Sequence, residues 1–262
     1  MSHALLLLGV GAASMFVVMA ATWVTAVRIK NAGIVDIAWS LNFSLLALLY
    51  AALGPGWTFR RMLILAMVAL WSLRLGGYLF ARVMGHHPVE DGRYQQLRQE
   101  WAPHADARFF WFFELQAALN LILSLPVLLA CLNPAPHFYS LELAAALLWA
   151  IALAGESVAD RQLDRFRKDP AHRGRTCQGG LWRYSRHPNY FFEWLVWVAY
   201  FLFAAASPWG VVTIFCPLLM LFFLLRVTGI PLTEIQALRS RGDEYREYQR
   251  TTSAFVPWFR KA

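Results

Sequence analysis

Charged side chains stand inside long apolar stretches of this 262-residue sequence. An ionisable group in such a stretch is costly unless it is paired or hydrated, so each one is a candidate for function. Two explanations stand: the charges tie helices together as ion pairs, or they line one water-accessible cavity. The residues concerned are Asp36, Arg74, Glu114, Glu156, Asp160, Glu193 and Arg226.

A second group of candidates follows the fifth apolar stretch. Residues 161–186 hold eight basic residues against two acidic ones, and seven of the eight are arginines. Membrane topology or attraction to anionic lipid explains a positive loop, but neither requires arginine. Because a guanidinium group contacts phosphate in a bidentate manner, the loop fits the pyrophosphate or 2′-phosphate of a soluble cofactor. An apolar cavity beside it would fit a lipophilic substrate.

Composition places these residues in a membrane protein. The chain is 58% hydrophobic and 15% charged, whereas soluble domains average about 25% charged residues. The pI of about 9.8 does not indicate nucleic-acid binding, because the basic residues lie in short segments between apolar runs. Scattered cysteines, and histidines without zinc-ligand spacing, predict neither a disulfide framework nor a metal site.

The apolar runs predict an all-α integral membrane protein, a bundle of seven transmembrane helices that forms one domain over residues 1–262. Each run approaches the roughly 20 residues that cross a bilayer. The expected spans are Leu5–Val27, Val35–Leu53, Met62–Val83, Phe109–Cys131, Leu141–Asp160, Tyr190–Ala206 and Val211–Ile230.

The distribution of basic residues predicts the orientation. They concentrate in loops at about 84–108 and 161–189 and in a tail at about 231–262, whereas the opposite side holds only Arg60 and Arg61. The positive-inside rule therefore places the amino terminus outside and the carboxyl terminus in the cytoplasm. Most of the embedded charges fall in the cytoplasmic halves of their spans, so we expect a site that opens to the cytoplasm.

Five motifs together resemble the steroid 5-alpha-reductase family, and its bacterial branch most closely. The resemblance extends from about residue 31 to 260 and implies an enzyme of the bacterial inner membrane that binds NADPH from the cytoplasm. It would reduce the C4–C5 double bond of a 3-oxo-Δ4 steroid or a similar lipophilic enone, and we expect a monomer. The motifs are "GIVDIAW", "LRLGGYLFAR", "EDGRYQQLR", "GGLWRYSRHPNYFFEWLVW" and "YREYQRTTSAFVPWF".

The resemblance also carries cofactor-site residues onto this chain. The cofactor positions of the family fall on Arg74, Asp160, Arg167, Asn189 and Glu193, and residues near them in the sequence complete the expected site. The phosphate candidates are arginines, for each of which a solvated loop charge is the alternative, and two tyrosines are candidates for stacking or hydrogen bonding. The full set is Arg74, Glu156, Asp160, Arg167, Arg175, Arg183, Tyr184, Arg186, Asn189, Tyr190 and Glu193.

The catalytic group must act at the carbonyl of the enone. Hydride goes to the β-carbon and negative charge develops on the carbonyl oxygen, which needs a hydrogen-bond donor in a dry site. The resemblance places Asp36 where the animal enzymes have the glutamate that meets this oxygen. A buried acid can stay protonated and donate; alternatively, Asp36 pairs with Arg74 or another charge. The partner tyrosine of the animal enzymes is replaced by Trp71 here, and Tyr78 is the candidate substitute.

One motif leaves other functions open. The Arg-His-Pro-Asn-Tyr motif alone also resembles motifs of isoprenylcysteine and phospholipid methyltransferases and of sterol C14-reductases. A membrane methyltransferase that uses S-adenosylmethionine is therefore the alternative, although that cofactor has no phosphates to match the arginines. A non-enzymatic lipid-binding or transport protein is another alternative.

His187 also has an architectural explanation, since the side chain of a histidine in a His-Pro step before a helix often bonds to backbone. Relatives usually have glycine at Phe192, so helix packing there is expected to differ.

Overall fold

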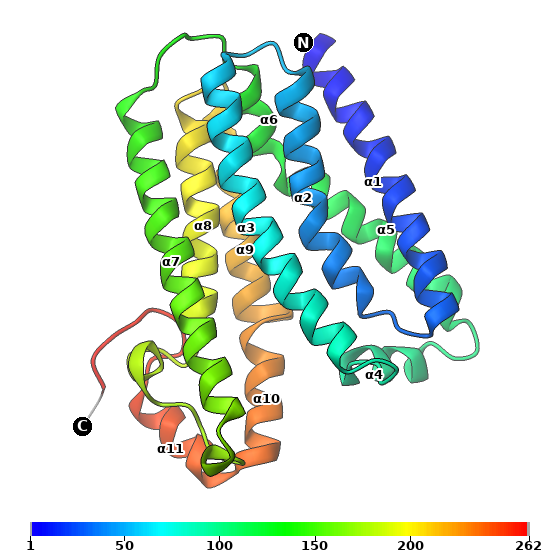
Figure 1. Cartoon of the computed structure of the whole chain (residues 1–262), viewed down its shortest axis with the longest axis vertical. Helices are drawn as coiled ribbons and strands as arrows, with labels where there is room; N and C mark the ends of the chain where they lie inside the picture. The colour runs from blue at the N-terminus through cyan, green and yellow to red at the C-terminus, as the bar shows by residue number, and fades with distance from the viewer. Residues whose placement is uncertain (1, 261–262) are drawn as a thin grey trace. The chain divides into compact units, whose positions relative to one another are not determined.

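The computed structural model describes residues 2–260, and within that range the chain is helical without any strand, as predicted. The chain divides into two compact units. Unit 1 comprises Met1–Phe138 and Ala206–Gly210, and unit 2 comprises Tyr139–Ala205 and Val211–Ala262. Figure 1 shows the course of the helices.

Unit 1 is built around three long helices. The second and third pack along each other most extensively, and the first packs against the second and the fifth. A short helix, α4, follows the end of α3. The helices are α1 (Ser2–Ile29), α2 (Ile34–Leu53), α3 (Thr58–Gly85), α4 (Gly92–Glu100), α5 (Ala105–Leu123) and α6 (Leu125–Leu132).

The fourth expected span, Phe109–Cys131, is not one continuous helix. The structure begins it earlier, at Ala105, and interrupts it at Ser124 between α5 and α6. Pro126 lacks an N–H and cannot donate back along the helix, and at the interruption the Ser124 hydroxyl donates to the Leu121 carbonyl at 2.8 Å. Ala105–Leu132 nevertheless remains one apolar segment that is long enough to cross a membrane.

Of the two basic residues on the side expected to lie outside, Arg60 has a structural role, because it binds the segment after α6. Arg60, at the start of α3, is fully buried. Its guanidinium group donates to the carbonyls of Asn133, Ala135 and His137 at 3.1, 2.8 and 2.5 Å. The charge therefore holds a turn in place, which is a structural use of arginine.

Unit 2 pairs two long helices and ends in a string of shorter ones. The helices α7 and α8 pack side by side along their lengths. The elements are α7 (Ser140–Lys168), the short 3₁₀ turns η1 (Pro170–His172) and η2 (Gly180–Arg183), α8 (Pro188–Ala205), the 3₁₀ turn η3 (Gly210–Ile214), α9 (Phe215–Phe222), the π-turn η4 (Phe223–Val227), α10 (Ile230–Arg241) and α11 (Asp243–Thr251).

In the contact between α7 and α8, Gly155 faces the ring of Phe192. A Cβ atom on Gly155 would lie 2.5 Å from the nearest carbon of the Phe192 ring, which is far inside van der Waals contact. The ring therefore fills the space that any side chain at 155 would need. Gly155 on α7 is therefore the residue that makes room for Phe192 of α8.

The seventh expected span, Val211–Ile230, is also corrected by the structure. It begins as the 3₁₀ turn η3, continues as α9 and widens into the π-turn η4. A Cβ on Gly229 would lie 2.5 Å from the Leu224 carbonyl oxygen, so the chain can pass there only as glycine. Pro231, in the first turn of α10, has no N–H to continue the hydrogen-bond ladder. The expected tail after residue 231 is likewise mostly helical, as α10 and α11.

Six helical segments within residues 2–260 are long and apolar enough to cross a membrane, so the chain is a multi-pass integral membrane protein. The expected span that is not among them is α8. It is 18 residues long, and Asn189 and Glu193 in its first turns reduce its apolar character.

Candidate functional site

The carboxylate of Asp36 on α2 is held by two residues of α4. Both of its oxygens accept from Nη2 of Arg93 at 3.0 Å, and Oδ1 also accepts from the Tyr94 hydroxyl at 2.7 Å. The Asp36 side chain remains 27% exposed. Of the two alternatives for Asp36, the structure has the pairing with a charge, and Arg93 rather than Arg74 is the partner.

Tyr94, and not Tyr78, is the tyrosine that the structure brings to Asp36. Tyr94 is fully buried, and its ring lies 4.5 Å from the Arg93 guanidinium carbon. Burial, and then the charge of Asp36, raises the pKa of Tyr94 well above its usual value, so its hydroxyl stays a donor. Tyr78 on α3 is 40% exposed and makes no hydrogen bond within residues 2–260. Tyr94 belongs to a motif that the sequence singled out, but only its place in three dimensions gives it this role.

Ion pairs fasten α4 in position. Asp91 caps the first turn of α4 and also forms an ion pair with Arg82 of α3. Burial favours the neutral carboxyl, but hydrogen bonds from backbone and guanidinium groups lower the pKa of Asp91 below its usual value. Glu90, only 8% exposed, accepts the Ala32 N–H at 2.6 Å and bonds Arg98 at 3.0 Å. These contacts hold α4, and with it Arg93 and Tyr94, beside Asp36.

Four predicted cofactor residues lie along the contact between α7 and α8. The carboxylates of Glu156 and Glu193 are buried, with 4% and 9% exposure, and both lie near Tyr200 of α8. Nδ2 of Asn189 donates to Oδ1 of Asp160 at 3.3 Å, which links the two helices directly. The four-residue spacing in each helix thus places its two polar residues on the face that meets the other helix.

Asn189 leaves one polar atom for a partner outside the protein. Its Nδ2 is occupied by Asp160, and its Oδ1 is buried and accepts no hydrogen bond from the part of the chain that the structure describes. An unsatisfied buried acceptor costs roughly 1–3 kcal/mol. A ligand donor or an ordered water molecule at this position would remove that cost.

The arginines between residues 161 and 186 divide into an exposed group and the enclosed Arg186. The side chains of Arg167, Arg175 and Arg183 are exposed, and their guanidinium groups form no hydrogen bond or ion pair with any described residue. Arg167 lies inside α7, which continues to Lys168, so the expected loop 161–189 begins as helix. Further exposed arginines without protein partners in the described range are Arg161, Arg165 and Arg173.

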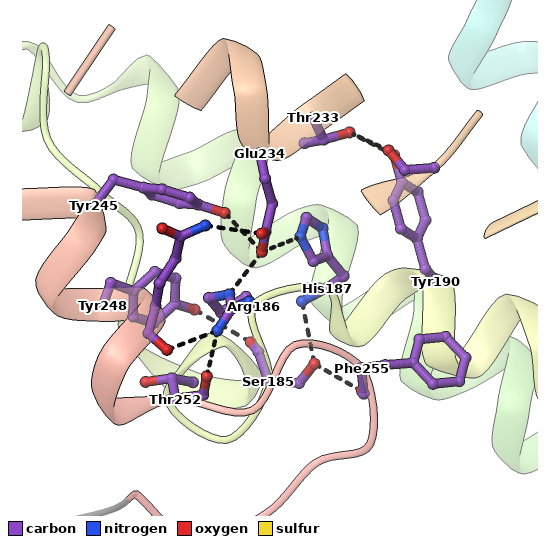
Figure 2. Close-up of polar contacts among 12 residues, drawn as sticks. Ser185, Arg186, His187, Tyr190, Thr233, Glu234, Tyr245, Tyr248, Thr252 and Phe255 are labelled. Atoms are coloured by element: carbon purple, nitrogen blue, oxygen red, sulfur yellow. Dashed lines mark hydrogen bonds and ion pairs between the residues drawn. The ribbon is translucent and has the colours of Figure 1, made fainter. Parts of the chain in front are cut away.

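Arg186 has a different role from the one predicted for it. Its Nε donates to Oε1 of Glu234 at 2.7 Å, and its Nη1 donates to the carbonyls of Gln249 and Thr252 at 2.9 and 2.7 Å. The side chain is only 11% exposed. Figure 2 shows these contacts converging on the guanidinium group from α10, from α11 and from the segment that follows it. Arg186 therefore ties helices together and is not a phosphate ligand in this arrangement.

His187 and Tyr190 belong to the same structural cluster. Nε2 of His187 lies 3.2 Å from Oε1 of Glu234, and its ring stacks in parallel on Tyr190 at 5.4 Å. Burial lowers the pKa of His187, although Glu234 opposes the shift. The Tyr190 hydroxyl lies 3.2 Å from that of Thr233. His187 thus has a structural role, but its ring contacts the Glu234 carboxylate and Tyr190 and not the backbone that was expected, and Tyr190 belongs to the same cluster (Figure 2).

The C-terminal motif docks on the Arg-His-Pro-Asn-Tyr segment. The Ser185 hydroxyl donates to the Phe255 carbonyl at 2.8 Å, and the Trp258 N–H donates to the Tyr184 carbonyl at 2.9 Å. The Tyr184 ring is 38% exposed and meets Phe259 edge-on at 6.2 Å. Two motifs about 70 residues apart in the sequence are thus one structural element.

Comparison with known proteins gives a family but no activity. Residues 22–252 match the family model described as "Protein of unknown function (DUF1295)". A relative from Schizosaccharomyces pombe, "Uncharacterized protein C594.04c", is 30% identical over 224 residues, which cover 76% of this chain and 64% of the relative. The chain thus spans less than two thirds of the length of that relative. No solved structure matches the chain significantly.

Proposed function

Because the chain belongs to the DUF1295 family, which leaves the reaction open, we propose from its own residues that it is an NADPH-dependent membrane reductase. The proposed substrate is a 3-oxo-Δ4 steroid or a similar lipophilic enone that enters from the bilayer and is reduced at its C4–C5 bond. We propose seven spans, with α8 as the one beyond the six apolar segments. The amino terminus would lie outside, the carboxyl terminus in the cytoplasm, and the enzyme would act as a monomer in a bacterial inner membrane.

The observation that carries the proposal is the set of unpartnered arginines between residues 161 and 183. Six guanidinium groups are exposed there without an acidic partner among the described residues. Unpaired positive charge held in one segment repels itself and is stabilised when an anion binds. A cofactor with a pyrophosphate and a 2′-phosphate matches this set, and Arg167, Arg175 and Arg183 would hold those groups.

The contact between α7 and α8 supports the other end of the same cofactor. The buried Oδ1 of Asn189 is an acceptor without a protein donor in the described range, and a carboxamide N–H or a ribose hydroxyl would satisfy it. Asp160, beside Asn189, can accept from a ribose hydroxyl. NADPH would supply the hydride; the protein must bind it, orient it and exclude water.

The cluster of Asp36, Arg93 and Tyr94, within unit 1, offers the kind of hydrogen-bond donor that the carbonyl of an enone needs. Arg93 uses Nη2 for Asp36 and Tyr94, while its Nε and Nη1 form no hydrogen bond with the described residues. These N–H groups are donors for a carbonyl oxygen that gains negative charge as the β-carbon accepts hydride; the α-carbon then takes a proton from solvent. In this proposal Asp36 is a positioning residue that aims Arg93, instead of the proton donor that the sequence suggested.

The test is a ligand and turnover comparison in detergent. We expect NADPH to raise the unfolding temperature, since a ligand at 100 times its Kd adds about 2.7 kcal/mol to the folded state. NADPH oxidation should then require an enone, tested with a panel of 3-oxo-Δ4 steroids and unrelated lipophilic enones. Stabilisation by S-adenosylmethionine in place of NADPH would support the methyltransferase alternative, and no response to either would contradict both.

A further inference from the structure

Unit 1 carries an open groove of about 340 Å³ beside α5. It is lined by Trp101, Arg108, Trp111, Phe112 and Leu115. The last four lie on α5 at spacings of three, one and three residues, which place them on one face of the helix. This groove does not include any residue used in the proposed reaction.

One wall of the groove is fixed and the other is open to the surroundings. The Trp101 ring meets Phe112 edge-on at 6.0 Å and belongs to a packed aromatic cluster. Trp111 and Leu115, in contrast, are 71% and 58% exposed. Because Ala105–Leu132 is a candidate membrane span, these exposed apolar side chains belong in contact with lipid chains. Arg108 and Leu115 are separated by roughly 10 Å along the helix axis.

Arg108 gives the groove a polar end. Its side chain is exposed, and its guanidinium group forms no ion pair or hydrogen bond within residues 2–260. Asp106, two residues earlier, is already paired with Arg98 at 3.1 Å. The groove therefore has one positive charge that the protein does not neutralise, at the level where α5 begins, and an apolar wall that leads away from it.

We propose that this groove binds one anionic phospholipid of the surrounding bilayer. The phosphate would lie against Arg108, and an acyl chain would follow Trp111 and Leu115. The indole N–H groups of Trp101 and Trp111 form no hydrogen bond within the described residues, so they are donors for the phosphate or ester oxygens. A zwitterionic headgroup brings its own cation toward Arg108, whereas an anionic headgroup does not, so the site should prefer a net negative lipid.

Native mass spectrometry of the detergent-purified chain tests this proposal. The probes are phosphatidylglycerol and phosphatidylcholine with identical acyl chains. We expect the first phosphatidylglycerol to bind about fivefold more tightly, the effect of one arginine near an anionic headgroup. Arg108→Gln should remove that preference, because phosphatidylglycerol loses more affinity than phosphatidylcholine, and Arg108→Lys should retain it. Leu115→Trp, which adds bulk to the apolar wall, should weaken the binding of both lipids.

Arg28→Gln is the matched control, because Arg28 near the end of α1 is also exposed and without a partner in the described range. It should keep the preference for phosphatidylglycerol. Equal losses in Arg28→Gln and Arg108→Gln would overturn the proposal in favour of general surface charge, and so would a wild-type chain that binds both lipids equally. Circular dichroism confirms that each variant is folded before its lipid binding is compared.

Discussion

At the scale of the residue, partners decide which charges can act on a ligand. Arg175 and Arg186 lie in the same basic segment, yet Arg175 is exposed and Arg186 is enclosed by Glu234 and by two backbone carbonyls. The sequence predicted phosphate contact for both. It could not separate them, because the groups that enclose Arg186 come from helices some 48–66 positions later in the chain.

The partner of Asp36 could not be predicted from the sequence either. Its place in an apolar helix was predictable, but its partner Arg93 is 57 positions away on a short helix. The shared helix faces of Asp160 with Glu156 and of Asn189 with Glu193 were, in contrast, predictable from the four-residue spacing, although the hydrogen bond between Asn189 and Asp160 was not predicted. Local periodicity indicates which helix face a residue occupies, while ion pairs between distant segments depend on the fold.

Removing the Asp36 carboxylate should separate turnover from cofactor binding. In Asp36→Ala the Arg93 side chain loses the group that aims it, so we expect turnover to fall on the order of 100-fold. NADPH affinity should stay within about twofold, because the phosphate candidates lie elsewhere in the chain. Enzyme kinetics and a binding titration on the same preparation measure both quantities, with Tyr94→Phe as the milder variant. A variant that loses NADPH binding but keeps its rate would refute this role.

Removing one unpartnered arginine should weaken the binding of the cofactor and nothing else. Arg175→Gln should lower NADPH affinity roughly fivefold to tenfold, and the remaining affinity should depend less on salt, because one charge contact is lost. The control is Arg246→Gln, an exposed arginine that is already paired with Asp243 at 2.6 Å. Titrations at two salt concentrations measure the effect, and equal affinities for Arg175→Gln and the wild type would exclude Arg175 from the site.

At the scale of the element, the apolar pattern predicted which helices exist but not where all of them break. Five of the seven expected spans correspond to single helices, α1, α2, α3, α7 and α8. The fourth is interrupted at Ser124, beside Pro126, and the seventh is divided into η3, α9 and η4 before Gly229. Pro126 could be recognised in the sequence as a residue that interrupts a helix. The π-turn before Gly229 could not, because it depends on the backbone passing within contact of Leu224.

The packing of α7 against α8 yields a stability prediction. In Gly155→Ala the new methyl group meets the Phe192 ring, so we expect a loss of roughly 1–3 kcal/mol, as for other overpacked cores. Phe192→Ala in the same chain should recover much of that loss, because the two sites share one space. Gly77→Ala is the control, since a Cβ there meets no atom within 4 Å. Thermal unfolding in detergent measures the wild type, the single variants Gly155→Ala, Phe192→Ala and Gly77→Ala, and the double variant, and additive losses from Gly155→Ala and Phe192→Ala would contradict the proposed contact.

At the scale of the whole molecule, the chain is a helical membrane protein of the DUF1295 family, made of two compact units. Charge asymmetry carries the proposed orientation, and the buried role of Arg60 leaves even less basic charge free on the outer side. The all-helical fold class was predictable, because hydrophobic runs of this length form few structures other than membrane-spanning helices. The reaction was not, since it depends on side chains whose partners come from distant segments.

The orientation can be tested with introduced cysteines, because all three native cysteines are buried. We expect Trp209→Cys, between α8 and η3, to react with a membrane-impermeant maleimide added outside intact cells. Ser240→Cys, near the end of α10, should react only after the membrane is permeabilised. Both native positions are exposed. Labelling of Ser240→Cys from outside would reverse the proposed orientation.

Transfer of an isotope from cofactor to product tests the central claim most directly. The purified chain is incubated with NADPH that carries deuterium at the transferable C4 position, together with a 3-oxo-Δ4 steroid, and the product is analysed by mass spectrometry. The proposed reductase should give a saturated ketone with one deuterium on the former β-carbon of the enone, and Asp36→Ala should give almost none. If no enone in the panel acquires deuterium, while a lipid acquires a methyl group from S-adenosylmethionine, the chain is not this reductase.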